Sequence, residues 1–141
     1  MSSIKKTTSV IITAIIVAGI AFSLTEQFDS DNSVILDQIE LDAVYLESEN
    51  FIKISFDDKS KNTKSAILEI LGMDVTYHKE YIFNDESSFI EMVYLEKIPK
   101  YGWETTPVTL EIYHSQFGKI GLKTEIHEQG DSIPKIIVEQ K

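Results

Sequence analysis

The 141-residue chain contains no cysteine and no arginine. Without cysteine it can form no disulfide, thiolate metal site, cysteine nucleophile or lipid-modified cysteine anchor. Glycine and proline are scarce, at six and three residues, and no glycine-rich phosphate-binding loop is present. A disulfide scaffold and a phosphate-loop nucleotide-binding protein are therefore both excluded.

Negative charge dominates the composition. All 13 basic residues are lysines, against 23 Asp and Glu, which gives a formal net charge of −10. The first 24 residues hold only Lys5 and Lys6, so the other 117 residues carry a formal charge of −12. Lysines that could contact phosphates are outnumbered about two to one by acids, so we expect no nucleic-acid partner.

An uncharged apolar run from Thr7 to Leu24 follows Lys5 and Lys6. As a helix its length would be about 27 Å, close to the bilayer core thickness of about 30 Å. We favour a retained transmembrane helix over 1–24; the alternative is a secretory signal cleaved before Leu24. In both cases the two lysines keep the N-terminus cytoplasmic, which predicts that the rest of the chain is extracytoplasmic.

A third interpretation makes the apolar run the polymerising helix of a pilin-like subunit. Such a subunit would be cut next to the lysines, usually after a small residue. The stretch Lys5 to Thr8 offers no Gly, Ala or Ser at that place. The pilin-like subunit is therefore the least favoured of the three.

Residues 25–33 are mostly polar and predict a linker, after which 34–141 form one extracytoplasmic domain. Runs rich in Ile, Val, Tyr, Phe and Thr recur there every 8 to 14 residues, which is typical of an all-β domain. We predict strands at about 34–46, 51–57, 65–71, 75–83, 88–95, 107–115, 119–127 and 135–139. The expected fold is an all-β, two-sheet antiparallel sandwich of seven or eight strands.

The hairpin over 107–127 allows its register to be predicted. With Gln116, Phe117 and Gly118 as the loop and Gly118 left-handed, Ile112 lies opposite Leu122 and the aliphatic residues share one face. The same register lays Tyr113 over Gly121 on the other face.

Three further predictions place the neighbouring strands. In 75–83, Val75, Tyr77, Tyr81 and Phe83 are expected on the core side. The strand 88–95 is apolar on both faces and is therefore placed centrally in a sheet. The last strand follows Pro134, which predicts an edge strand.

This architecture resembles the small membrane-anchored immunoglobulin-like or fibronectin-like sandwiches of archaeal and bacterial cell surfaces. The resemblance covers the anchor and the strand count, and the Cys-Trp-Cys pattern of antibody domains is absent. It implies adhesion, scaffolding or accessory roles and brings no catalytic residue with it.

Metal ligands are few. His114 and His127 are expected at opposite ends of the hairpin and so cannot share a metal. A surface copper or zinc contact through His78 and Glu80 is the one transition-metal site that we consider, since both lie on the outward side of their strand. A calcium loop at 29–33 is disfavoured because Val34 replaces the glycine that such a loop needs.

Catalytic motifs are absent: there is no G-x-S-x-G elbow, no S-x-x-K and no marked carboxylate pair. We therefore expect no enzyme activity and no cofactor. Asp57 and Asp58 are expected to form a turn, because aspartate side chains bond to nearby backbone.

The longest predicted loop, 96–107, carries Tyr101 and the only tryptophan, Trp103. Rigid aromatic side chains on a loop are frequent partner-binding anchors. The alternative, which we favour for Trp103 and Tyr101, is that they fold back and plug one end of the sandwich.

Together these patterns favour a membrane-anchored structural or interaction module that binds another cell-envelope component, such as a surface-layer protein. The alternative is an extracytoplasmic module that binds a ligand or a calcium, copper or zinc ion.

Overall fold

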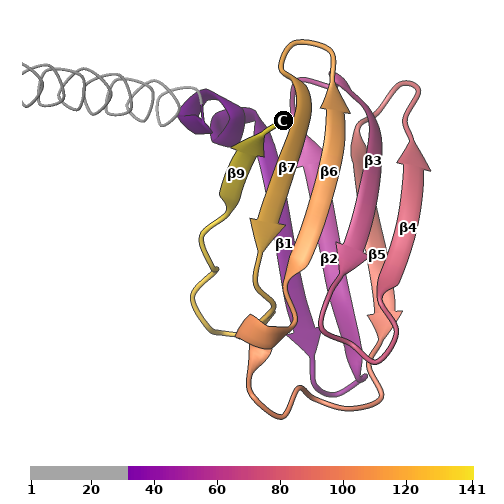
Figure 1. Ribbon diagram of the computed structural model, residues 1–141, viewed down its shortest axis with the longest axis vertical. Helices are drawn as coiled ribbons and strands as arrows, with labels where there is room; N and C mark the ends of the chain where they lie inside the picture. The colour runs from indigo at the N-terminus through magenta and orange to yellow at the C-terminus, as the bar shows by residue number, and fades with distance from the viewer. Residues whose placement is uncertain (1–31) are drawn as a thin grey trace, which may run out of the picture. The chain divides into compact units, whose positions relative to one another are not determined.

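The computed structural model describes residues 32–141 (Figure 1). The chain divides into two compact units, residues 1–37 and 38–141. The predicted membrane span lies outside the described residues, as do its signal and pilin alternatives. In the described part no helix is long and apolar enough to cross a membrane.

Residues 32–38 are helical, so the first strand begins at Ile39 and not at the predicted residue 34. A short apolar run such as 34–36 does not by itself distinguish a strand from a helix. The residues that follow it, Asp37 and Gln38, are poor strand formers, and this favours the helical state. Most of the predicted linker and of the disfavoured calcium loop lies outside the described residues.

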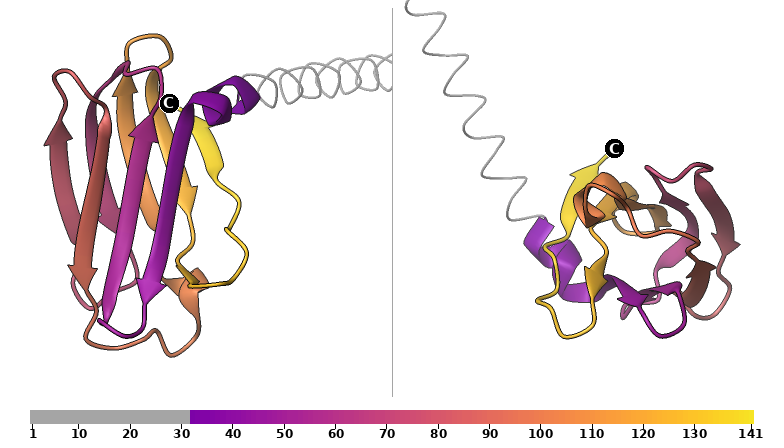
Figure 2. Two further views of the ribbon diagram at one scale, coloured as in Figure 1. Left: turned by 180° about the vertical axis from the view of Figure 1, so that it is seen from behind. Right: turned by 90° about the horizontal axis from the view of Figure 1, so that it is seen from below.

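Nine strands build the second unit. They are β1 (Ile39–Leu46), β2 (Phe51–Asp58), β3 (Thr63–Ile70), β4 (Tyr77–Ile82), β5 (Ser88–Tyr94), β6 (Val108–His114), β7 (Gly118–Thr124), β8 (His127–Glu128) and β9 (Ile137–Gln140), with a 3-10 turn at Trp103–Thr105 between β5 and β6. One sheet has the order β5-β2-β1-β8 and the other β4-β3-β6-β7-β9 (Figures 1 and 2). All pairs are antiparallel except β1 with β8. The predicted two-sheet β-sandwich is confirmed, but it has nine strands in place of the predicted seven or eight, because the two-residue β8 was not predicted.

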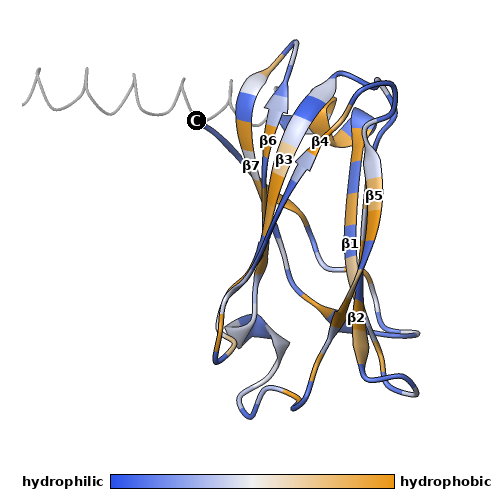
Figure 3. Cartoon of the chain, turned by 90° about the vertical axis from the view of Figure 1, so that its right-hand side faces the viewer, coloured by the Kyte–Doolittle hydropathy of each residue, from blue (hydrophilic) through white to orange (hydrophobic). Residues whose placement is uncertain are grey.

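The core lies between the two sheets and follows from the period of two along each strand. Hydrophobic and hydrophilic residues alternate along the strands (Figure 3). The buried apolar residues of the strands are Ile39, Leu41, Ala43 and Tyr45 of β1, Ile52, Ile54 and Phe56 of β2, Ala66, Leu68 and Ile70 of β3, Val93 of β5, Val108, Leu110 and Ile112 of β6, and Ile120 and Leu122 of β7.

The positions of three strands test the sequence predictions. β9 is an edge strand, as predicted from Pro134. β5 is also an edge strand, so its predicted central position is wrong. Its second apolar face lies on the outer side of the sheet, where its side chains are exposed. β4 begins only at Tyr77, which leaves Val75 80% exposed instead of in the core.

The hairpin register differs from the prediction by two residues. Ile112 pairs with Ile120, not with Leu122, and His114 pairs with Gly118. The loop closes one residue earlier because the Nδ1 atom of His114 accepts hydrogen bonds from the backbone N–H groups of Gln116 and Phe117. A shift of two residues leaves every side chain on the same face, so the predicted buried face is nevertheless confirmed.

The corrected register also changes the pairs on the outer face. Tyr113 lies opposite Lys119, and Gly121 lies opposite Glu111. The prediction that Tyr113 covers Gly121 is therefore wrong. The side chain of Lys141 lies there instead, with its Cε 3.2 Å from where a Cβ on Gly121 would be.

Gly118 has φ of +76°, as predicted, and a Cβ at this position would meet no atom within 4 Å. Gly118→Val is therefore expected to destabilise the fold by about 1–2 kcal/mol through backbone strain alone. Chemical denaturation measures this free energy of unfolding. Gly118→Asn is the control, because asparagine tolerates the left-handed region; an equal loss for both variants would show that strain is not the cause.

Candidate functional site

A row of exposed apolar side chains lies on the outer face of the four-stranded sheet. Ile90, Met92 and Tyr94 of β5 are 66%, 40% and 60% exposed. Phe51, on β2, lies opposite Tyr94 with the rings edge to face at 5.7 Å. We call these four residues the apolar face; the strands that carry them lie toward the viewer in the left view of Figure 2.

The apolar face borders Leu46 of β1, which pairs with Phe51 and is half-buried. Lys53 of β2 lies between Met92 and Val44 and interrupts the apolar surface at that point. Contiguous exposed apolar side chains are uncommon on a monomeric soluble domain and mark interaction surfaces. The sequence shows that β5 is apolar on both faces, and this pattern predicted that both faces are buried.

Inner-side contacts fix the position of β5. The carboxylate of Glu91 accepts hydrogen bonds from Lys79 at 2.7 Å and from the hydroxyl of Tyr81. The ring of Tyr81 also stacks on Phe89 with centroids 4.1 Å apart. These contacts join β5 to β4, the edge strand of the other sheet.

The contacts around Glu91 shift the pKa values of Glu91 and Tyr77. Burial alone would raise the pKa of Glu91, but the hydrogen bonds from Lys79, Tyr81 and Tyr77 outweigh it and hold the pKa below its usual range. Burial and the bond to Glu91 raise the pKa of Tyr77 to about 12. The apolar face is thus presented by a strand whose supporting carboxylate stays ionised and bonded at neutral pH.

Trp103 and Tyr101 differ in their surroundings. Trp103 is half-buried and packs on Tyr45, a core residue of β1, with ring centroids 5.0 Å apart. Tyr101 is 76% exposed, and the ammonium of Lys100 lies over its ring. The two predicted anchor residues therefore do not form one surface; their role in partner binding stays a prediction.

His78 and Glu80 lie on the exposed edge strand β4. Nε2 of His78 is 3.4 Å from Glu80, and its Nδ1 is 3.7 Å from Glu69. The two carboxylates face opposite ring nitrogens, so they do not converge on one ion. Residues 32–141 contain no group of three or more potential metal ligands, and the contact through His78 and Glu80 stays a prediction that a thermal shift with zinc or copper would measure.

A buried polar cluster at one end of the sandwich was not predicted. The side chains of Asp58 and His114 are fully buried, with Nε2 of the histidine 3.4 Å from the carboxylate. Ser60 donates its hydroxyl to Asp58 at 2.6 Å and lies 3.3 Å from the same Nε2. The cluster therefore brings together the three residue types of a hydrolase triad.

The hydrogen-bond directions are not those of a triad. Nδ1 of His114 accepts backbone N–H groups, so the proton of the neutral ring is on Nε2. The Ser60 hydroxyl proton points to Asp58, and the Nε2 of His114 that faces Ser60 is protonated, so no imidazole lone pair is available to activate the hydroxyl. The cluster joins the β2–β3 turn to the β6–β7 turn and does not activate a nucleophile. The prediction that Asp57 and Asp58 form a turn is confirmed for Asp58, whose carboxylate accepts hydrogen bonds from the backbone of the turn at residues 60, 62 and 63. It is wrong for Asp57, which lies within β2.

Acid is expected to destabilise this cluster. Burial lowers the pKa of His114 below 6.5, and the nearby Asp58 carboxylate only partly opposes this shift. Because the unfolded chain then binds the proton more readily, the stability contributed by neutral His114 is complete above pH 6.5 and is lost as the pH falls through its folded pKa. The pKa of Asp58 is also lowered: burial would raise it, but hydrogen bonds from Ser60 and Thr63 outweigh burial. Its contribution is lost only below 3.8.

We therefore expect the free energy of unfolding to decrease as the pH falls below 6.5. Denaturation at a series of pH values measures this slope. His114→Gln should flatten it. An unchanged slope in His114→Gln would contradict the assignment.

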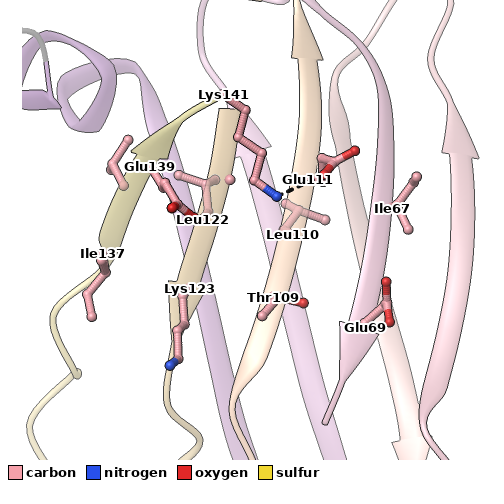
Figure 4. Close-up of a pocket in the computed structure, with 12 residues that line it drawn as sticks. Ile67, Glu69, Thr109, Leu110, Glu111, Leu122, Lys123, Ile137, Glu139 and Lys141 are labelled. Atoms are coloured by element: carbon pink, nitrogen blue, oxygen red, sulfur yellow. Dashed lines mark hydrogen bonds and ion pairs between the residues drawn. The ribbon is translucent and has the colours of Figure 1, made fainter. Parts of the chain in front are cut away.

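The outer face of the five-stranded sheet carries an open hollow of about 490 Å³ (Figure 4). Lys141 reaches across it, and its ammonium lies 3.1 Å from Glu111, which also pairs with Lys119 at 3.2 Å. The hydrogen bond from Lys141 lowers the pKa of Glu111. The Glu111 carboxylate in the hollow is thus already paired within the chain.

No family model, no curated protein sequence and no solved structure matches the chain.

Proposed function

We propose that this protein is a membrane-anchored, extracytoplasmic interaction module that binds another protein of the cell envelope. The observation that carries the proposal is the apolar face, in which Ile90, Met92 and Tyr94 expose large apolar side chains in one row. Burying such a row against a partner removes apolar surface from water, which is a main driving force of protein association.

A binding role is proposed in place of a catalytic one. In the described part, His114 and Asp58 are buried beside the half-buried Ser60, and their hydrogen bonds leave no imidazole lone pair to activate the serine. The anchor and the extracytoplasmic location are supported by the apolar run from Thr7 to Leu24 after Lys5 and Lys6.

The finer fold assignment, to the immunoglobulin-like or fibronectin-like sandwiches, belongs to the same proposal. It is supported by the division of the seven longest strands into β5-β2-β1 and β4-β3-β6-β7, with successive strands β2 and β3 in different sheets. Domains of this architecture are common at cell surfaces, where they serve in adhesion and scaffolding.

The test is crosslinking of the full chain in intact cells with a membrane-impermeant amine reagent. Wild-type protein should give a crosslinked product, and Tyr94→Ser should lose most of it, because a large aromatic anchor is removed from the apolar face. Tyr113→Ser is the matched control: Tyr113 is 53% exposed, similar to Tyr94, but lies on the other sheet.

The free energy of unfolding of both variants should lie within about 0.5 kcal/mol of the wild-type value, because each substitution is at an exposed position. Equal product from Tyr94→Ser and wild type would contradict the binding role of the face. Product that forms only after the cells are permeabilised would contradict the extracytoplasmic location.

A further inference from the structure

The backbone of β5 leaves one row of hydrogen-bonding groups unpaired. The N–H of Leu95 donates to the carbonyl of Asn50, and the carbonyl of Ser87 accepts the N–H of Asp58. In an antiparallel strand the backbone groups of successive residues point to opposite sides, so those of residues 89, 91 and 93 also point toward β2. The backbone groups of Ser88, Ile90, Met92 and Tyr94 therefore point away from β2, at the open edge of the sheet.

Along its row of outward backbone groups, this edge has none of the features that normally prevent strands from pairing. Such features are lysine or other charged side chains, proline, bulges or very short strands. The four residues with outward backbone groups on β5 are uncharged, contain no proline and belong to a seven-residue strand. Three of them also carry the exposed side chains of the apolar face.

The other edges of the described sheets differ. The N–H of Phe83 donates to the carbonyl of Lys64 on the side of β3. Because the direction alternates along the strand, the backbone groups of His78, Glu80 and Ile82 point outward on β4. Two of these three residues are ionisable. β8 has two residues and β9 has four. Among the strands of residues 38–141, β5 is the long edge strand whose outward backbone groups belong only to uncharged residues.

We propose that a second copy of this chain pairs with β5 edge to edge, antiparallel, about a two-fold axis normal to the sheet. The proposal rests on the proposed function and deepens it, because the pairing builds the surface that binds the envelope protein from the apolar faces of two copies. It joins two four-stranded sheets into one eight-stranded sheet. This axis keeps both apolar faces on the same side, so they merge into one surface, as an isologous interface requires.

Charge selects the register of this pairing. If β5 strands were centred on Glu91, the two Glu91 residues would lie directly opposite each other, which is unfavourable. Centring on Met92 places Met92 opposite its copy, Ile90 opposite Tyr94, and Glu91 opposite Val93. All outward backbone groups at 90, 92 and 94 then find partners, and the outer contacts are apolar.

The net charge gives the pairing a salt dependence. Two copies with a formal charge of −10 each repel one another at long range, whereas the paired residues of the outer row are uncharged. Salt screens the repulsion and leaves the apolar contact intact. The fraction of dimer is therefore expected to rise with ionic strength.

The absence of cysteine permits a direct test with single cysteine variants of the full chain in membranes, oxidised with copper phenanthroline. Met92→Cys should give a covalent dimer on a non-reducing gel, because Cα atoms of directly paired residues lie about 5.5 Å apart, within disulfide range. Ile90→Cys is the matched control. Its side chain is the more exposed, but its copy lies four residues away, about 13 Å along the strand.

A Met92→Cys dimer at least tenfold more abundant than that of Ile90→Cys would support the pairing. Equal dimer from both variants, or dimer only from Ile90→Cys, would overturn it. Monomeric Met92→Cys would also overturn it. The proposed function would survive that last result if Tyr94→Ser still abolished crosslinking to a different protein, and would fail with it if Tyr94→Ser had no effect.

Discussion

Replacing Asp58 with alanine is expected to lower the free energy of unfolding by about 3–5 kcal/mol, the range for breaking a buried charged network from one side. Asp58 is 1% exposed and accepts the backbone N–H and the hydroxyl of Thr63 at 2.9 and 2.7 Å. It also accepts the corresponding groups of Ser60 at 2.9 and 2.6 Å. Removing the carboxylate leaves these donors without their acceptor and takes away the negative charge 3.4 Å from Nε2 of His114.

Urea denaturation measures the free energy of unfolding of Asp58→Ala and of Asp57→Ala, two substitutions at neighbouring positions of β2. Asp57 has the same side chain but is exposed, so its loss should change stability by no more than about 0.5 kcal/mol. Similar stability of the two variants would show that the buried cluster does not hold the two turns together.

Trp103→Ala is expected to have the second largest effect, about 2–3 kcal/mol, below the 3–5 kcal/mol of a fully buried tryptophan because Trp103 is half-buried. Its ring covers Tyr45 at the end of the core. Tyr101→Ala, two residues away, removes an exposed ring and should leave the melting temperature nearly unchanged.

Thermal unfolding followed by circular dichroism measures both variants. If Trp103→Ala melted like wild type, the ring would not be part of the folded end of the sandwich. The loop would then return as a candidate for partner binding alongside the apolar face.

The sequence predicted the sandwich well because most strands bury one face and expose the other. The alternation in β2, β3 and β6 follows from burial and needs no knowledge of neighbouring strands. The same dependence on burial patterns led to the wrong position of β5. An apolar outer face gives the same sequence pattern whether it is buried within the domain, covered by a partner or exposed to solvent.

Register and the buried cluster depend on side-chain contacts that alternation does not encode. The hairpin register was predicted from a left-handed Gly118 and a shared aliphatic face, whereas His114 closes the loop by bonding to its own turn. The residues Asp57 and Asp58 predicted a turn, but not that His114, more than fifty residues later, packs on Asp58. Local patterns therefore located the turn, and tertiary packing determined its partner.

The central claim is that the edge and apolar face of β5 bind a protein partner, and amide hydrogen exchange tests it without knowing that partner. The full chain is compared in native membranes and, diluted, in detergent. The amides of Ile90, Met92 and Tyr94 should exchange more slowly in the membranes, because a paired strand or packed partner protects them. Peptides of β4, whose edge residues include His78 and Glu80, serve as the internal control and should not change. Identical exchange of β5 in the two samples would contradict the claim.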